Sequence, residues 1–263
     1  MLLSSCGSET ASTEENVNED SLVETSQEVV VQKVEFQSLD SLLITANLYE
    51  VDPSKPIMVL CHQANFCKYE YSGIAERFNE LGFNCLAVDL RSGGPIADQP
   101  NETWLRAFEQ GKPYDYLDAE QDIIAAINYA FEKYQQKVII MGSSYSSTLC
   151  VYQGLENDKV KAVISFSPGN YFAVERGDLI EPLIKFEKPF FFTAARHEMP
   201  YVRELVLGRK RNAHQIVFSP EGAGWHGARA LWPTQEGSEE YWMALEDFLE
   251  DLKTYDETDT TAI

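Results

Sequence analysis

The feature that most constrains the fold is a series of short apolar runs separated by stretches with helical periodicity. Several runs are continuously apolar rather than alternating, as strands require when both faces of a sheet are covered. The six runs lie at 56–61, 83–89, 137–142, 160–166, 188–195 and 214–219. Repeated strand–helix–strand units of this kind predict a mainly parallel, twisted α/β sheet with helices on both faces.

The helices between these runs carry start and stop signals. The pattern predicts one helix over 68–81 that stops at Gly82, and a second that begins at an N-cap, Asp118. A third covers 238–252 and has acidic residues in its first turn, where the helix dipole favours them. A shorter helix is expected near 177–186.

The length of 263 residues fits one large domain rather than two. Residues 28–50 have the pattern of a β-hairpin, so we expect the domain to cover 28–253 with about eight strands. Residues 1–27 are mostly polar and acidic, which predicts a flexible tether. Residues 254–263 are expected to form a disordered acidic tail.

Composition excludes several classes of function. Lys plus Arg number 21 against 42 Asp plus Glu, for a net charge of −21, which lacks the cationic surface of a nucleic-acid binder. No apolar run approaches the ~18 residues that a membrane span needs. The chain has no Rossmann or P-loop glycine pattern, and its His and Cys are not grouped as metal ligands. We therefore expect no nucleotide, flavin or metal cofactor.

The start of the chain carries a candidate lipidation site. Leu3-Ser4-Ser5-Cys6 resembles a bacterial lipobox, and the acidic run after it resembles the export signal of some surface lipoproteins. Against this, only five residues precede Cys6, whereas a signal peptide has roughly 7–15 apolar residues. On the lipobox interpretation a lipid on Cys6 anchors the protein in a bacterial cell envelope; otherwise it is soluble.

The remaining cysteines fit no zinc pattern. Cys61, Cys85 and Cys150 lie in apolar segments, so we expect buried free thiols. A disulfide between Cys61 and Cys67 is left open by the sequence.

A serine-rich turn follows the 137–142 run and precedes a helical stretch. Strand, sharp turn, Ser and helix are the elements of a nucleophile elbow, whose tight turn needs small flanking residues. Ser144 is centred in this turn between Gly142 and Ser146, where the usual pattern has a second Gly. Ser144 is therefore the predicted nucleophile, with Ser143 and Ser146 as alternatives and some crowding expected from Ser146.

A Ser nucleophile needs a base, and the chain has four His. Ligands bind at the carboxyl ends of parallel strands, so a catalytic residue should follow a strand. His214 precedes its strand, and His62 comes too early for the order nucleophile, acid, base. His197 lies in the loop expected for the acid. His226, in the loop after the last strand, meets both conditions and is the predicted base.

The third residue must orient the His and stabilise its charged form. No Asp lies between Asp178 and Asp247, so an acid in the expected loop must be Glu. Glu198 directly follows the 188–195 run and is the predicted acid. Asp178 and Glu175 in the preceding crossover remain alternatives.

These segments, in this order, resemble the α/β-hydrolase superfamily, over roughly residues 28–252. The resemblance rests on CHQA at 61–64, DLRSGG at 89–94, GSSYS at 142–146, ARHEMP at 195–200 and GWHG at 224–227. The first two motifs resemble the dienelactone-hydrolase-like and esterase-like groups. Ser in the elbow departs from the Cys of dienelactone hydrolase and from the Asp of haloalkane dehalogenase. The resemblance implies the α/β-hydrolase fold and a metal-free serine hydrolase.

The resemblance also implies where an oxyanion would be held. The donors would be the backbone N–H groups of Tyr145, just after the nucleophile, and of Ala64, with Gln63 as the alternate. His62 is expected to be structural, and Arg91 to tie a loop.

The substrate pocket is expected to be open. Only about twenty residues separate Pro168 from Lys188, where many relatives carry a cap domain, so the lid should be small or absent. Aromatic residues near the predicted mouth suggest an apolar pocket. The candidate pocket residues are Gln63, Phe66, Tyr171 and Trp225, and the further aromatic candidates are Tyr69, Tyr71, Tyr145 and Phe172.

The predicted function is hydrolysis of a carboxylic ester, a small-molecule substrate, through an acyl-enzyme on Ser144. Amide, thioester or lysophospholipid hydrolysis on the same fold is one alternative. A non-catalytic binding protein that kept the fold is the other. The sequence does not specify the ester, its acyl length or the oligomeric state.

Overall fold

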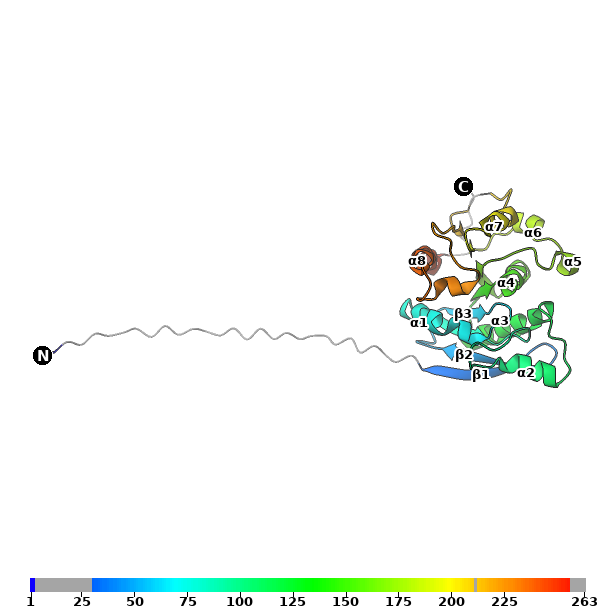
Figure 1. Cartoon of the computed structure of the whole chain (residues 1–263), viewed down its shortest axis with the longest axis horizontal. Helices are drawn as coiled ribbons and strands as arrows, with labels where there is room; N and C mark the ends of the chain where they lie inside the picture. The colour runs from blue at the N-terminus through cyan, green and yellow to red at the C-terminus, as the bar shows by residue number, and fades with distance from the viewer. Residues whose placement is uncertain (3–29, 211, 256–263) are drawn as a thin grey trace.

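The computed structural model describes residues 1–2, 30–210 and 212–255. The lipidation candidate Cys6 lies outside the described residues, as do most of the predicted tether and the predicted acidic tail. The ordered elements run from Val31 to Thr254 and build around one sheet (Figure 1).

The sheet has eight strands in the order β1-β2-β4-β3-β5-β6-β7-β8. The predicted hairpin is present, because β1 pairs antiparallel with β2, and β2 pairs antiparallel with β4. All other neighbours are parallel, as the strand–helix alternation predicts. The strands are β1 (Val31–Gln37), β2 (Leu43–Tyr49), β3 (Ile57–Cys61), β4 (Asn84–Val88), β5 (Val138–Ser143), β6 (Val160–Phe166), β7 (Phe190–Thr193) and β8 (Gln215–Val217).

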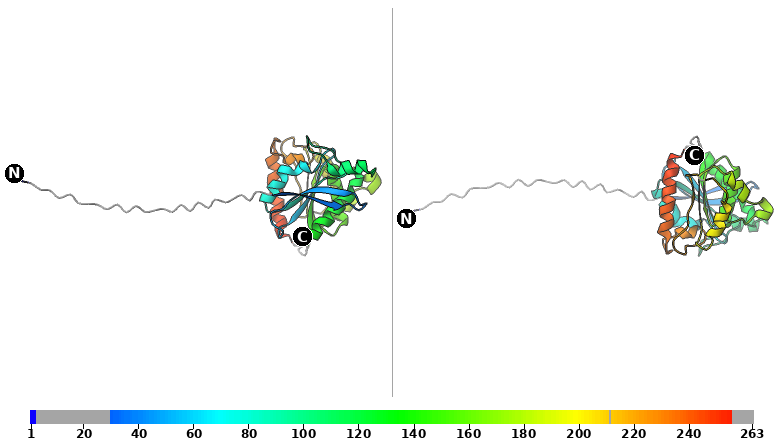
Figure 2. Two further views of the ribbon diagram at one scale, coloured as in Figure 1. Left: turned by 90° about the horizontal axis from the view of Figure 1, so that it is seen from below. Right: turned by 90° about the horizontal axis from the view of Figure 1, so that it is seen from above.

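Helices cover both faces of the sheet. On one face α1 and α8 pack side by side, and on the other lie α3, α4 and α7 (Figures 1 and 2). The helices are α1 (Ser72–Glu80), α2 (Glu102–Glu109), α3 (Glu120–Tyr134), α4 (Tyr145–Glu156), α5 (Ala173–Arg176), α6 (Ile180–Ile184), α7 (Met199–Leu205) and α8 (Ser238–Thr254). Three 3₁₀ turns accompany them, namely η1 (Lys68–Tyr71), η2 (Leu117–Ala119) and η3 (Ala228–Leu231).

Covering both faces explains the continuously apolar strands. Every residue of β3, β4 and β5 is buried, and the two faces form two separate hydrophobic clusters. Burial of this kind contributes about 25 cal/mol for each Å² of apolar surface removed from water. The carboxyl ends of the parallel strands therefore lie on a rigid base.

The helices differ from the prediction at three places. Asp118 does not cap α3: it lies in η2, its carboxylate accepts the Asp115 N–H at 2.8 Å, and the first residue of α3 is Glu120. The helix expected near 177–186 is present but shorter, as α6, and Gly177, with a φ of 94°, ends the preceding α5. Helix α2 was not predicted, although the Asn101 side chain caps it by accepting the Trp104 N–H.

No helix within the described ranges combines the length and apolarity needed to cross a bilayer. Over the same residues, no group of three or more His, Cys, Asp or Glu is arranged to hold a metal ion. The four described cysteines are free thiols and all are buried.

Candidate active site

The candidate nucleophile occupies a strained turn between β5 and α4. Ser144 has φ 59° and ψ −124°, a conformation that non-glycine residues rarely adopt. The turn closes only because position 142 has no side chain: a Cβ there would lie 2.4 Å from the Ser147 Cα. The local sequence thus specifies an elbow that presents Ser144 at the carboxyl end of the sheet.

Ser146 strengthens this turn instead of merely crowding it. Its hydroxyl accepts the Ser143 N–H at 3.0 Å and lies 2.8 Å from the carbonyl of Cys61, to which it donates. Cys61 is the last residue of β3, so the hydroxyl ties the elbow to the neighbouring strand. A second glycine, with no side chain, would lack both bonds.

Ser144, His226 and Glu198 form a continuous hydrogen-bonded chain. The Ser144 Oγ lies 2.7 Å from the His226 Nε2, and the His226 Nδ1 lies 2.5 Å from the Glu198 Oε1. The three residues follow β5, β8 and β7, and they are 28 to 82 positions apart in the chain. The His and Glu side chains are both partly buried, which limits competition from water.

Glu198 is held in its ionised form. Burial opposes its charge, but hydrogen bonds from His226 and Ser167 outweigh burial and lower the pKa of Glu198 below its ordinary value. Its second oxygen, Oε2, accepts the Ser167 hydroxyl at 2.8 Å and the Ala195 N–H at 3.2 Å. An ionised carboxylate with both oxygens engaged can orient the His226 ring and stabilise its protonated form.

Ser167 is a site residue that the sequence analysis missed. It directly follows β6 with a φ of 58°, and its hydroxyl donates to Glu198 while accepting the Gly227 N–H at 3.0 Å. It therefore joins the acid to the loop that carries His226. Its position at the carboxyl end of a parallel strand was the available signal, because the same rule selected the other three residues.

The alternatives left open by the sequence lie elsewhere. Asp178 accepts the Ile180 N–H, and neither it nor Glu175 contacts His226. The Ser143 hydroxyl donates to Glu70, and that of Ser146 to Cys61. The other His are also occupied or remote: His214 contacts Asp251, and His197 is exposed.

The loop after β3 is fixed from beneath by His62. This side chain is fully buried; its Nδ1–H donates to the Gln63 carbonyl at 2.8 Å, and its Nε2 accepts the Leu90 N–H at 2.9 Å. Burial lowers the pKa of His62, which favours this neutral form. His62 is thus a structural residue that shapes the loop carrying Ala64.

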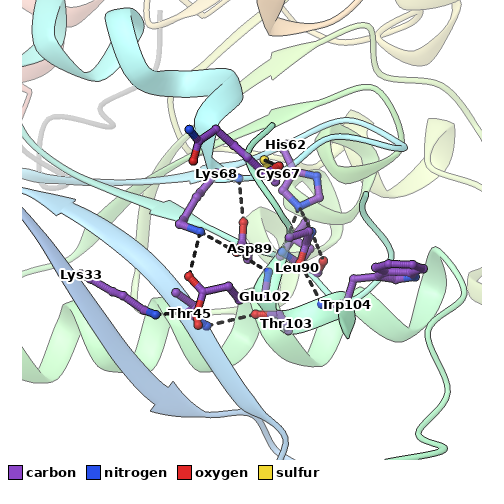
Figure 3. Close-up of polar contacts among 12 residues, drawn as sticks. Lys33, Thr45, His62, Cys67, Lys68, Asp89, Leu90, Glu102, Thr103 and Trp104 are labelled. Atoms are coloured by element: carbon purple, nitrogen blue, oxygen red, sulfur yellow. Dashed lines mark hydrogen bonds and ion pairs between the residues drawn. The ribbon is translucent and has the colours of Figure 1, made fainter. Parts of the chain in front are cut away.

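A buried ion pair between Lys68 and Asp89 also holds this loop. The Lys68 Nζ lies 2.8 Å from the Asp89 carboxylate and 3.5 Å from that of Glu102 (Figure 3). The Asp89 carboxylate also accepts the N–H groups of Lys68 and Glu102, so it joins the β3 loop to the start of α2. Although burial opposes the charge of Lys68, the two carboxylates raise its pKa above the ordinary value.

The two predicted oxyanion donors both follow strands, because Tyr145 begins α4 after β5 and Ala64 lies in the loop after β3. Tyr145 is the first residue of α4, so its N–H has no acceptor within the helix. Ala64 follows Gln63, whose own N–H is already taken by the Glu70 carboxylate at 2.7 Å. Gln63 is therefore excluded as the alternate donor by an existing bond, and Ala64 remains.

We compared the sequence and the structure with those of known proteins. No family model matches the sequence. The structure is similar to the esterase Pf2001 of Pyrococcus furiosus, with a TM-score of 0.66 and 16% identity over 85% of this chain and 93% of that one. It is also similar to a dienelactone hydrolase from Anabaena variabilis, with a TM-score of 0.60 and 14% identity over 84% and 98% of the two chains.

The chain has the α/β-hydrolase fold. One curated relative, the acyltransferase drtE of Aspergillus calidoustus, is 28% identical over 151 residues, or 54% of this chain. The match covers 44% of that relative, so this chain spans less than half its length.

An open cleft of ≈ 680 Å³ lies beside the turn that carries Ser144 and Tyr145. Asn65, next to Ala64, lies in its wall, and Tyr116 in its wall contacts Tyr145 with ring centroids 4.7 Å apart. The aromatic lining is Trp104, Tyr114, Tyr116, Tyr171 and Phe172, and the charged lining is Asp115, Asp118 and Glu175. The cleft is thus an aromatic surface with only negative charge.

Of the predicted pocket residues, Tyr171 and Phe172 line this cleft. Gln63 is buried and faces Gly227, and Phe66 stacks on Trp232 at 6.1 Å between centroids. The Trp225 ring instead lies under the Arg229 guanidinium, 5.7 Å from the ring centroid to Cζ. The sequence analysis missed the aromatic residues between 104 and 116, because nothing local shows that this segment turns back to the site.

Proposed function

We propose that this protein is a serine hydrolase that cleaves carboxylic esters. The observation that carries the proposal is the unbroken chain of hydrogen bonds from the Ser144 Oγ through His226 to Glu198. A serine hydroxyl is a weak nucleophile unless an adjacent base removes its proton. The fold of solved esterases and the short α5 and α6 between β6 and β7 agree with this activity.

The reaction would proceed in two halves. The Ser144 Oγ attacks the ester carbonyl carbon while the His226 Nε2 takes its proton, and His226 returns that proton to the departing alcohol. Water then attacks the acyl-enzyme with His226 again as the base, which releases the acid and restores Ser144. Glu198 holds the ring of His226 and balances its charge in both halves.

The negative charge of each tetrahedral intermediate needs donors. The N–H groups of Tyr145 and Ala64 would supply them, and one such donor typically accounts for about 10²–10³ in rate. Tyr145 is held by the elbow, and Ala64 by the His62 and Lys68 contacts beneath its loop. Rigid support on both sides matters because the donors act only if they are already in place.

The first experiment is hydrolysis of p-nitrophenyl acetate by the wild type, Ser144→Ala and His226→Ala. We expect kcat/KM to fall about 10³-fold or more in either variant, because each removes an essential part of the chain. Ser54→Ala and His214→Ala serve as matched controls, because Ser54 is exposed and bonds to Asp52, and His214 contacts Asp251. A fluorophosphonate probe should label the wild type at Ser144, and full activity in either variant would overturn the assignment.

Acyl transfer to an alcohol is a second candidate. It shares the acyl-enzyme, which an alcohol resolves in place of water, and the curated relative is named an acyltransferase. The open cleft has room for a second substrate. Adding primary alcohols during turnover and measuring the ratio of ester to acid products separates the two, and a panel of amides and thioesters tests the remaining bond types.

A further inference from the structure

One buried carboxyl beneath the site has no part in the proposed chemistry. Glu70 lies in η1, and only 1% of the residue is exposed. Its carboxylate does not contact Ser144, His226 or Glu198. A buried acid is costly unless its oxygens are engaged, so its contacts indicate why it is there.

Each oxygen of this carboxylate accepts a hydrogen bond from a different loop. The Oε2 accepts the Gln63 N–H at 2.7 Å, and the Oε1 accepts the Ser143 hydroxyl at 2.9 Å. The Ser143 Oγ in turn accepts the Ala228 N–H at 2.8 Å. Glu70 therefore reaches three loops that are far apart in the chain.

The three bonded residues are neighbours of the reacting groups. Gln63 precedes the oxyanion donor Ala64, Ser143 precedes the nucleophile, and Ala228 lies two residues after His226. We infer that Glu70 is the positioning residue that aligns the oxyanion loop, the nucleophile elbow and the histidine loop with one another. This inference rests on the proposed function, because it assigns those three loops their roles.

The three loops are packed closely around Glu70. Gly227 has φ 71°, and a Cβ there would lie 2.5 Å from the Ser143 Oγ and 3.0 Å from the Gln63 Oε1. The Trp232 indole N–H also donates to the Glu70 carbonyl at 2.9 Å, which fixes the turn that carries the carboxylate. A displacement of the carboxylate must therefore move at least one of the three loops.

The bonds as they stand suit an ionised carboxylate, because both groups that face its oxygens donate to them. A proton on Oε1 would reverse the Ser143 bond, because the Ser143 hydroxyl would then accept from Glu70 instead of donating to it. Burial raises the pKa of Glu70 to about 7, while its hydrogen bonds and the charges of Arg229 and His226 oppose the rise. Tyr71 also faces this carboxyl, and Glu70 contributes to the raised pKa of that phenol. Protonation near neutral pH would therefore loosen the alignment.

The test compares Glu70→Gln, Glu70→Asp and Ser143→Ala with the exposed control Glu80→Gln on α1. We expect Glu70→Gln to lower kcat about 10- to 100-fold with KM changed less than about threefold, because the loss is one of alignment. As the pH falls below about 7, kcat/KM of the wild type should decrease with the protonation of Glu70, and this additional step in the pH profile should be missing from Glu70→Gln. Glu70→Asp keeps the charge and should restore this step.

Ser143→Ala keeps Glu70 and removes the link to Ala228, so kcat should fall even if Glu70→Gln does not fold. The rate of fluorophosphonate labelling at Ser144 should fall in parallel, independently of any ester. Glu70→Gln and Ser143→Ala with the kcat, pH profile and labelling rate of Glu80→Gln would overturn the inference alone. A wild type without Ser144-dependent turnover or labelling would instead overturn the proposed function.

Discussion

At the scale of single residues, the site depends on backbone conformations that the surrounding atoms must hold. Ser144 and Ser167 both have positive φ, and each such residue costs of order 1–3 kcal/mol. Ser144 is held by its N–H bond to the Phe166 carbonyl at 2.8 Å, and Ser167 by the Thr193 carbonyl at 2.7 Å. Both acceptors are strand ends, so the sheet itself maintains the strain.

Gly142→Ala tests how tightly the elbow is packed. The added Cβ would lie 2.4 to 2.6 Å from backbone atoms of Ser146 and Ser147, which cannot rotate away. We expect a loss of about 1–3 kcal/mol in the free energy of unfolding, together with loss of activity. Gly73→Ala, where nothing lies within 4 Å of the new Cβ, is the control and should change stability by less than about 1 kcal/mol. Equal effects in the two variants would contradict this account.

Glu70 also makes a prediction about stability and pH. Its pKa rises from 4.5 to about 7 on folding, so between these values the folded state binds more protons than the unfolded state. Stability contributed by this group therefore falls as pH rises through the window, by up to about 3 kcal/mol. In urea unfolding, the free energy of unfolding of Glu70→Gln relative to the wild type should increase by about this amount between pH 5 and pH 8. A pH-independent difference between the two proteins would argue against the raised pKa.

At the scale of elements, a buried network joins the hairpin, the loop after β4 and α3. The Arg91 guanidinium is fully buried and donates to Asp122 at 2.7 Å and to Asp40 at 2.9 Å. The hydrogen bonds from Arg91 hold the pKa of Asp40 well below its usual range. The Ser38 hydroxyl donates to Asp122 as well, so one charge cluster fixes three elements.

Removing Arg91 should therefore be costly. Arg91→Ala leaves the buried Asp122 carboxylate without its cation, and we expect a loss of about 3–5 kcal/mol in the free energy of unfolding. Lys253→Ala, which breaks the exposed pair with Glu250 on α8, should cost about 0–1 kcal/mol. Denaturant unfolding of the two variants measures the contrast, and a small effect of Arg91→Ala would show that the network is not what holds these elements.

At the scale of the whole molecule, net charge and cleft charge have the same sign. The chain carries −21, and the cleft is lined by Asp115, Asp118 and Glu175 with no Lys or Arg among its described lining residues. A cleft of one sign raises the local concentration of opposite charge and lowers that of like charge. The field therefore disfavours anionic ligands in this cleft.

Esters with a free carboxylate should accordingly be poor substrates. We expect p-nitrophenyl hemisuccinate to have a kcat/KM about tenfold below that of its neutral methyl ester at low salt, with a smaller gap at high salt. Glu175→Gln should narrow the gap, whereas Glu181→Gln, outside the cleft lining, should not. A gap that ignores both salt and Glu175 would point to shape rather than charge.

The sequence by itself determined the strands, the hairpin and the residues that follow the strand ends at the site. Apolar runs and turn residues are local signals. The small residues of the elbow, the order of nucleophile, acid and base, and the rule that ligands bind at the carboxyl ends of parallel strands together selected Ser144, Glu198 and His226. Helix boundaries were less accurate, because Asp118 has the residue type of a cap without the geometry.

Only the tertiary structure decided which polar groups meet. Glu70 and Ser143 are 73 positions apart, and the cleft residues near 104–118 come from a segment with no local mark of its destination. Such contacts depend on how the loops cross over the sheet, and periodicity carries no information about that. The alignment of the site residues therefore depends on tertiary packing, whereas the local sequence determines which residues follow the strand ends.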